Sequence, residues 1–221
     1  MERLPLFPLN TVLFPHTTMP LHVFEERYKL MIGRCLEARS PLRASAFGVV
    51  LIRSGDEVGG PAEPHDIGTS ARVVQVQRLP DGRMNLLVLG ERRFRILALD
   101  TTEPYLQGDV EWLSSEAVDA PDVDEAAQRV TALFGEQFRL VLAVTGQWVR
   151  RLDLPSDPDT LADFVAGNLD LPPLAKQELL EQLSLPARLA HLSELLGERI
   201  RALTDRWDER RRKKFAGAVL N

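Results

Sequence analysis

The pattern of apolar residues changes once along this chain of 221 residues, and that change constrains the fold more than any other feature. Up to about residue 113 the apolar runs are short and bounded by Pro or Gly, which is typical of β-strands. After about residue 122 apolar residues recur every three or four positions, which is typical of amphipathic helices. Residues 114–122 are small and acidic and include Pro121, which indicates a linker. The sequence therefore predicts two domains, residues 1–116 and 117–221.

The first part predicts a small closed or half-closed β-structure, because short strands at this spacing hide their edges when the sheet curls into a barrel. The clearest turn is Pro80-Asp81-Gly82, since Pro presets φ for the first turn position and Gly supplies a positive φ. A second reversal is predicted at Leu89-Gly90-Glu91, and a long exposed loop over residues 53–66. The predicted strands cover residues 11–14, 47–52, 71–79, 84–89, 94–99 and 105–112.

Helices are predicted by apolar spacing and by their start signals. One helix interrupts the strands, because apolar residues between Tyr28 and Leu36 fall on a single face. In the second part, residues 123–142 form an amphipathic helix, and Asp157-Pro158 is typical of a helix N-terminus. Two more helices begin near Pro173 and Pro186, the last with apolar residues through Trp207. The second part is therefore predicted to be a helical bundle.

Composition excludes several classes of protein. The single Cys cannot form an internal disulfide or a Cys-based zinc cluster, which favours a reducing compartment. The proline-broken N-terminus is wrong for a signal peptide, and no run approaches the roughly 20 apolar residues of a membrane helix. A net charge of −5 argues against nucleic-acid binding. We therefore expect a soluble cytoplasmic protein without a membrane partner.

No residue pattern supports catalysis. The sequence contains no Gly-Lys-Ser or Gly-Lys-Thr, so it has no P-loop for ATP. The lysines lie among charged helix residues, unlike the desolvated Lys of a serine-lysine peptidase. Cys35 belongs to the apolar helix face and is expected in the core. No two histidines have metal-ligand spacing; they are His16, His22, His65 and His191. We expect no catalytic residue, no cofactor and no metal.

Several motifs of this chain resemble those of the Lon protease N-terminal (substrate-binding) domain family. They are the LPLFPLNTVLFP opening at residues 4–15, MPLHVFEERY at 19–28, LGERRFRI at 89–96, Pro104-Tyr105, and LPPLAKQELL at 171–180. The chain departs from the family at His16, where Gly is frequent, and at Glu26, where Pro is frequent. The resemblance implies an α+β fold: a PUA-like pseudo-β-barrel with one inserted helix, followed by a C-terminal α-helical bundle. Larger members join this domain to an ATPase and a serine-lysine peptidase.

The resemblance and the apolar N-terminal residues together predict a non-catalytic module that binds exposed hydrophobic segments of client proteins. Apolar residues and prolines crowd between Phe7 and Pro20, and prolines favour strand edges, so part of this set is expected on the surface. The alternative is that all of them pack between barrel and helix. A groove between barrel and bundle would be the natural site. The candidate peptide contacts are Phe7, Leu9, Phe14, Met19 and Phe24.

Two other functions stay open. An RNA-binding PUA-like module would use a contiguous basic face over Arg92, Arg93, Arg95 and the basic run at residues 210–214, whereas arginines scattered beside Asp and Glu would favour protein binding. On a strand, Arg93 and Arg95 share one face and Phe94 the other, which predicts a solvated face over one core Phe. The basic run is predicted to be a solubilising, frayed tail. The third function is assembly through a homodimer. A separate protease or ATPase is a further candidate partner.

Overall fold

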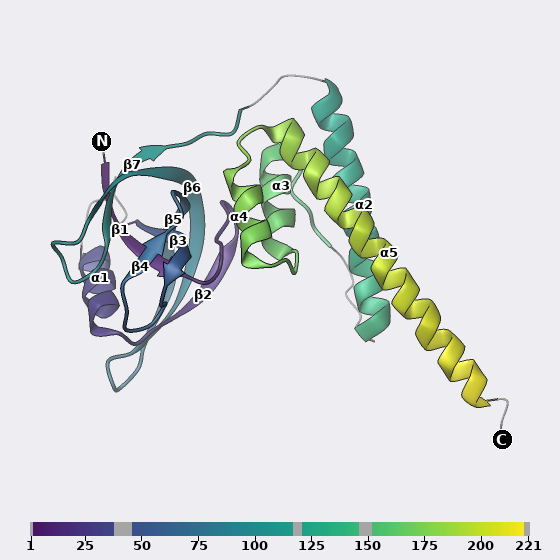
Figure 1. Cartoon of the computed structure of the whole chain (residues 1–221), viewed down its shortest axis with the longest axis horizontal. Helices are drawn as coiled ribbons and strands as arrows, with labels where there is room; N and C mark the ends of the chain where they lie inside the picture. Colours follow the sequence, from purple (N-terminus) through teal and green to yellow (C-terminus); the bar gives the residue numbers. More distant parts are fainter. Residues whose placement is uncertain (1, 38–45, 117–120, 146–151, 219–221) are drawn as a thin grey trace. The chain divides into compact units, whose positions relative to one another are not determined.

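The computed structural model describes residues 2–37, 46–116, 121–145 and 152–218 (Figure 1). The chain divides into two compact units. The strand unit contains residues 1–116 and 166–183, and the helix unit contains residues 117–165 and 184–221. The division at residue 116 follows the change in apolar pattern. Residues 166–183, by contrast, belong with the strands, although their pattern is helical.

The strand unit has a mixed α/β architecture. Its strands are β1 (Glu2–Leu9), β2 (Thr18–Val23), β3 (Phe47–Gly55), β4 (Ala62–Pro64), β5 (Ile67–Arg78), β6 (Met84–Asp100) and β7 (Gln107–Trp112). Its helices are α1 (Glu26–Glu37) and α4 (Pro173–Glu181). The described part of the helix unit contains α2 (Pro121–Thr145), most of α3 (Pro158–Asn168) and α5 (Leu185–Ala218).

The strand pairings form a closed ring. β1 pairs with β7 on one side and, in parallel, with β3 on the other, so the path β1-β7-β6-β5-β3 returns to its start. β2 pairs with β6 and β4 with β3, both antiparallel. β6 is long enough to pair with β2 through its first half and with β7 through its second half. Closure of the ring pairs the backbone N–H and C=O groups of β1 and β3 that would otherwise lie at open sheet edges.

The strand β6 corrects one predicted turn. The chain does not reverse at Gly90, which lies inside this strand of 17 residues. A Cβ on Gly90 would lie 2.2 Å from the carbonyl oxygen of Phe14. The Gly90 amide donates to the Thr17 carbonyl (2.9 Å), and its carbonyl accepts from the His16 amide (2.8 Å). Gly90 is therefore needed for close approach of another backbone, and the prediction of a turn was wrong because sequence does not distinguish the two uses of Gly.

Other predicted elements are confirmed or corrected. The turn at Gly82, with φ +83°, and the strands near residues 47–52, 71–79 and 105–112 are confirmed. Residues 11–14 form no strand; the flanking segments β1 and β2 do. The exposed loop over residues 53–66 is interrupted, because β3 continues to Gly55 and β4 pairs back on it. The wrong predictions for residues 11–14 and 53–66 have the same cause. Short strands that contain Pro show little alternation of apolar and polar residues.

The main core of the strand unit lies between α1 and the inner face of the ring. α1 buries Tyr28, Met31, Ile32 and Cys35, as the apolar spacing predicts. The Phe7 ring stacks on Tyr28, with ring centroids 4.2 Å apart. A smaller second cluster surrounds the fully buried Phe94. The one inserted helix therefore closes the apolar side of the ring.

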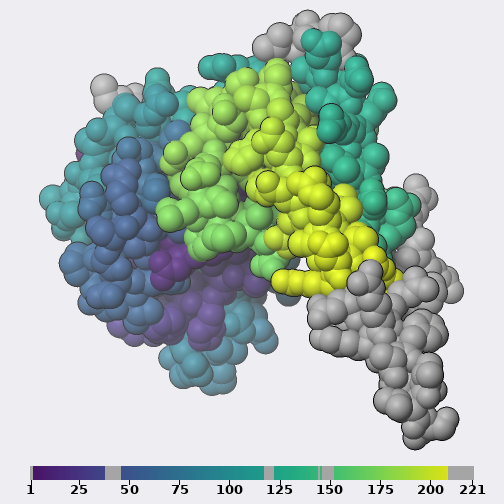
Figure 2. Space-filling view, turned by 45° about the vertical axis from the view of Figure 1, so that its right-hand side comes forward, coloured from purple at the N-terminus to yellow at the C-terminus, as the bar shows by residue number. Residues whose placement is uncertain are grey.

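α4 packs against β5, and its part of the chain, light green in Figure 2, lies beside the blue atoms of the strand unit. Gln177 Nε2 donates to the Ile67 carbonyl (2.9 Å), and Arg93 Nε donates to the Leu180 carbonyl (3.0 Å). Arg93 is consequently only 4% exposed. The prediction that Arg93 and Arg95 share a solvated face was wrong for Arg93, because a helix from a distant part of the chain covers it.

In the helix unit, α2 and α5 pack along each other. The predicted N-terminus of α3 is confirmed, since Asp157 Oδ2 accepts a hydrogen bond from the Thr160 amide (2.8 Å). Arg188 is fully buried beside the carboxylates of Asp159 and Asp163. The backbone of residues 210–214 continues α5, while the side chains of this basic run lie outside the described ones, so its role as a solubilising tail stays a prediction. Within the described residues, every helix is too short or too polar to cross a membrane.

Candidate functional site

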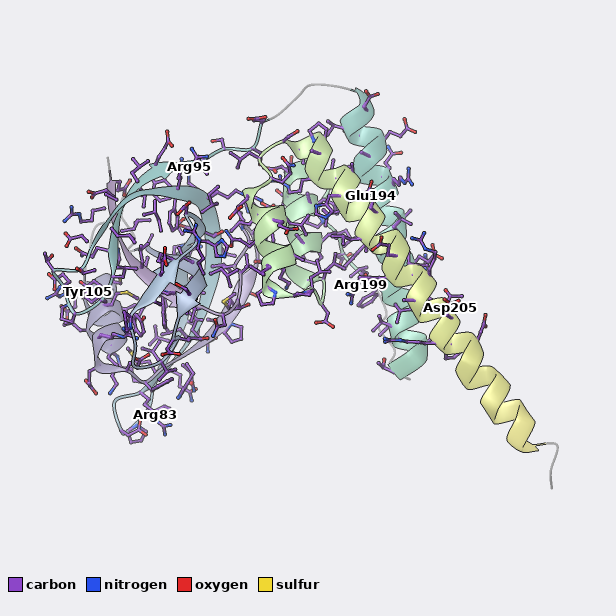
Figure 3. All side chains as sticks on the ribbon, in the orientation of Figure 1. Arg83, Arg95, Tyr105, Glu194, Arg199 and Asp205 are labelled. Carbon is purple, nitrogen blue, oxygen red and sulfur yellow. The ribbon has the colours of Figure 1, made fainter. Side chains whose placement is uncertain are left out.

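The strand unit contains a cavity of about 220 Å³. Its walls come from β1, the first turn of α1, the segment before and within β4, and the loop between β6 and β7. Tyr105 lies in the last of these walls (Figure 3). The lining residues are Pro8, Arg27, Tyr28, Pro61, Ala62, Thr101, Glu103, Pro104, Tyr105 and Leu106. Segments that are far apart in sequence thus meet around one small space.

One wall is a stack of three side chains. The guanidinium carbon of Arg27 lies 4.6 Å from the centroid of the Tyr28 ring, and Tyr28 stacks in turn on Phe7. Arg27 Nε donates to Glu25 Oε2 (3.1 Å) and Nη1 donates to the Gly60 carbonyl (3.1 Å). Burial raises the pKa of Tyr28, although the nearby Arg27 charge opposes this rise. At neutral pH the wall therefore presents an uncharged phenol beside a guanidinium held in place.

The opposite wall is held by Arg34 of α1. Arg34 Nη1 donates to the Tyr105 hydroxyl (2.8 Å) and lies 2.9 Å from Glu103 Oε2. The same guanidinium carbon lies 5.7 Å from the centroid of the Tyr105 ring. These contacts tie the β6–β7 loop to α1, so both walls depend on the same helix.

The predicted peptide contacts are distributed between core and surface. Phe7, Leu9 and Phe14 are 5%, 6% and 0% exposed, so for these three residues the alternative of packing in the core describes the structure. Met19 is half-buried and packs against the same cluster. Phe24 is 44% exposed. Of the five, Phe24 presents the largest accessible apolar surface, and its role as a contact stays a prediction.

Sequence reasoning did not propose the cavity residues as a site. In the sequence, Arg27 and Tyr105 belong only to family motifs and Tyr28 also to the apolar face of a helix, and nothing in their spacing brings positions 27 and 105 together. A usable signal exists in the composition: the chain has two tyrosines, and both line the cavity.

The groups considered for catalysis have structural roles. Burial raises the pKa of the Cys35 thiol to about 11, so it is not a thiolate at neutral pH. Burial also lowers the pKa of Lys176, whose Nζ donates to the Gly167 carbonyl (2.9 Å) and thereby satisfies the end of α3. Across residues 2–37, 46–116, 121–145 and 152–218, His, Cys, Asp and Glu form no group of three placed to hold a metal ion.

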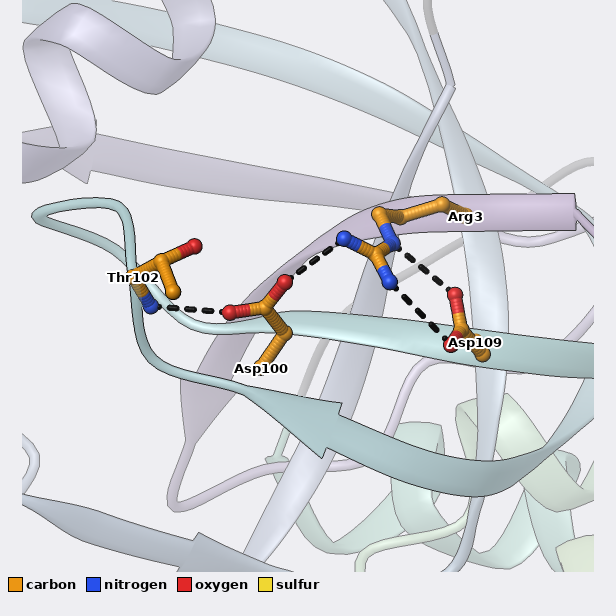
Figure 4. Close-up of polar contacts among 4 residues, drawn as sticks. All are labelled: Arg3, Asp100, Thr102 and Asp109. Atoms are coloured by element: carbon orange, nitrogen blue, oxygen red, sulfur yellow. Dashed lines mark hydrogen bonds and ion pairs between the residues drawn. The ribbon is translucent and has the colours of Figure 1, made fainter.

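Arginines on the outside of the strand unit lie beside carboxylates. Arg3 bridges Asp100 (2.6 Å) and Asp109 (2.8 Å), and hydrogen bonding to this guanidinium lowers the pKa of Asp109 (Figure 4). Arg95 lies 3.4 Å from Glu111 Oε2. Arg92 stacks on Trp112, with its guanidinium carbon 4.6 Å from the ring centroid. Charges of opposite sign thus lie together around Arg3 and Arg95, while the side chains of the basic run at residues 210–214 lie outside the described ones.

Comparison with known proteins gives close agreement over most of the chain. The Lon protease of Paraburkholderia phytofirmans is 34% identical over 206 residues, which cover 91% of this chain and 25% of the relative. The Lon protease of Anaeromyxobacter dehalogenans is 31% identical over 199 residues, which cover 89% of this chain and 23% of the relative. The chain thus spans about a quarter of the length of these relatives.

Solved structures show the same fold. A Lon N-terminal domain protein from Xanthomonas campestris matches with a TM-score of 0.61 and 28% identity, over 87% of this chain and 97% of that one. The N-terminal domain of Mycobacterium avium complex Lon protease matches with a TM-score of 0.66 and 22% identity, over 89% of this chain and 98% of that one. The family model of the ATP-dependent protease La (LON) substrate-binding domain matches residues 3–198. The chain belongs to this LON substrate-binding domain family.

Proposed function

We propose that this chain is a non-catalytic module that recognises client proteins by their exposed hydrophobic segments. The observation that carries the proposal is the match of residues 3–198 to a family defined as a substrate-binding domain. The curated relatives are proteases, and the matched portion is about a quarter of their length. The buried Cys35 thiol and the structural role of Lys176 support binding without chemistry.

We also propose a specific architecture, a cellular location and partners for this chain. The closed ring of strands supports a PUA-like pseudo-β-barrel, and the packed helices α2 and α5 support a C-terminal helical bundle. The single cysteine supports a reducing, cytoplasmic location. We further propose that an ATPase or protease receives the bound client. A homodimer would increase the affinity for clients with several apolar segments.

The test compares two states of one client. A small globular protein is presented in its native form and in a form kept unfolded by reduction and alkylation, and binding to the full chain is followed by fluorescence anisotropy. Because only the unfolded form exposes apolar segments, we expect it to bind at least about tenfold more tightly, a difference of roughly 1.4 kcal/mol. Equal affinity for both forms, or binding of neither, would contradict the proposed function.

A pair of variants locates the apolar contact. Phe24→Ser removes an apolar side chain that is 44% exposed, and the matched control Val74→Ser removes one that is 51% exposed on β5. We expect weaker binding of the unfolded client for the first variant only. If both variants lose the same affinity for the unfolded client, Phe24 is not a specific contact.

A further inference from the structure

The cavity between α1 and the β6–β7 loop has the size of a receptor for one side chain. Its volume of about 220 Å³ is below the roughly 300 to 1,000 Å³ of pockets that hold drug-sized molecules. The cavity is therefore matched in size to a single bulky side chain rather than to a whole nucleotide or a comparable cofactor.

The charges around the cavity are already paired within the strand unit; the buried Arg27 Nη2 lies 3.0 Å from Glu25 Oε2, although the geometry there is not that of a hydrogen bond. Arg27 interacts with Glu25, with the Gly60 carbonyl and with the Tyr28 ring. Glu103 is paired with Arg34, which also donates to the Tyr105 hydroxyl. A charged ligand would have to lose water without gaining a new partner of opposite charge. The lining therefore favours an uncharged ligand.

The lining also offers few backbone donors. Three of the lining residues, Pro8, Pro61 and Pro104, have no N–H group. Such a surface binds by apolar and stacking contact and cannot supply a ladder of backbone hydrogen bonds. A partner peptide would thus be held here through a side chain and not through its main chain.

The walls of the cavity are held in place by contacts within the strand unit. The stack of Arg27 on Tyr28 and of Tyr28 on Phe7 fixes one side, and the Arg34 contacts to Tyr105 and Glu103 fix the other. Side chains held in this way lose less entropy on binding.

From these observations we infer that the cavity receives one bulky, uncharged side chain of an extended client peptide. This inference rests on the proposed function and gives it a place and a selectivity: Leu-sized or Phe-sized side chains enter, and Asp or Lys side chains do not. Phe24, by contrast, would contribute only a general apolar surface.

The two tyrosines make the inference directly testable. Full-length protein labelled with 3-fluorotyrosine has two ¹⁹F resonances, one from Tyr28 and one from Tyr105, and both residues line the cavity. The Tyr105→Phe variant assigns them. The probes are capped Gly/Ser peptides that carry Phe, Leu, Asp or Lys at one central position. We expect saturable shifts with Phe and Leu, and binding at least about fivefold weaker with Asp and Lys. Equal shifts from all four peptides, or none from any, would overturn the inference.

The second test uses a variant whose cavity is filled by a larger side chain. Ala62→Phe places a large side chain in the lining, and Ala98→Phe makes the same change at an exposed position of β6. We expect Ala62→Phe alone to weaken binding of the Phe peptide at least about fivefold, with a dispersed ¹⁹F spectrum that reports folding. Equal binding by the two variants contradicts the inference.

The outcomes for the cavity and for the proposed function are separable. If the unfolded client binds while both ¹⁹F resonances stay in place, the cavity assignment is overturned and the proposed function stands. If the unfolded client does not bind, the proposed function fails and the cavity assignment falls with it.

Discussion

His16 adopts a backbone conformation that ordinary residues avoid. Its φ is +61°, in the left-handed region, and its amide donates to the Gly90 carbonyl. For a residue with a Cβ this conformation costs roughly 1 to 2 kcal/mol. Gly adopts a positive φ without this cost.

We predict that His16→Gly stabilises the protein by about 0.5 to 1 kcal/mol, because relief of the left-handed strain exceeds the entropy cost of Gly. The matched control is His22→Gly, which lies in β2 at an ordinary φ and should destabilise. Urea unfolding of both variants measures the difference. A loss of stability in His16→Gly would show that the His16 side chain contributes more than its backbone costs.

Substitution by Ala is expected to have opposite effects on stability at Gly90 and at Gly33. A Cβ at Gly90 would meet the Phe14 carbonyl oxygen at 2.2 Å, whereas nothing lies within 4 Å of a Cβ at Gly33 in α1. We therefore expect Gly90→Ala to destabilise by about 2 to 3 kcal/mol through overpacking. Gly33→Ala should stabilise by about 0.5 to 1 kcal/mol through helix propensity. Thermal unfolding of the two variants gives the signs, and equal signs would refute this assignment.

At the scale of elements, α4 depends on strands that precede it by more than 70 residues. Arg93 of β6 donates to the Leu180 carbonyl and Gln177 of α4 donates to the Ile67 carbonyl. These are buried hydrogen bonds, and loss of a partner leaves a desolvated polar atom. The helix is therefore a part of the strand unit and not a member of a separate bundle.

We predict that Arg93→Met destabilises the protein by about 2 kcal/mol, because the Leu180 carbonyl loses a charged donor. The control Arg95→Met removes a neighbouring arginine whose 3.4 Å pair with Glu111 is exposed, and it should change stability by less than about 0.5 kcal/mol. Hydrogen exchange of the α4 amides should rise in the first variant only. Similar exchange in both would show that α4 is held mainly by its apolar contacts.

At the scale of the whole molecule, the distribution of charge predicts that RNA is a poor partner. The net charge is −5, and Arg3, Arg72 and Arg95 each lie beside a carboxylate. We therefore predict a dissociation constant on the order of 100 µM or weaker for single-stranded RNA at physiological salt. Electrophoretic mobility shifts measure it. Submicromolar binding that weakens steeply with salt would revive the RNA-binding alternative.

The sequence by itself determined the local features. Apolar spacing located α1, Asp157 and Pro158 located the start of α3, and Gly82 located the hairpin turn, because each depends on residues a few positions apart. The motifs at residues 4–15 and 89–96 identified the family.

Only the tertiary structure decided which residues meet. It placed Gly90 against the Phe14 backbone, covered Arg93 with α4, buried Phe7 and Phe14, and brought Tyr28 and Tyr105 to one cavity. Each of these features depends on residues that are far apart in the sequence and meet only when the strands pair and the ring closes. A one-dimensional pattern records periodicity along the chain, but it does not record which distant segment covers a face, and burial depends on that segment.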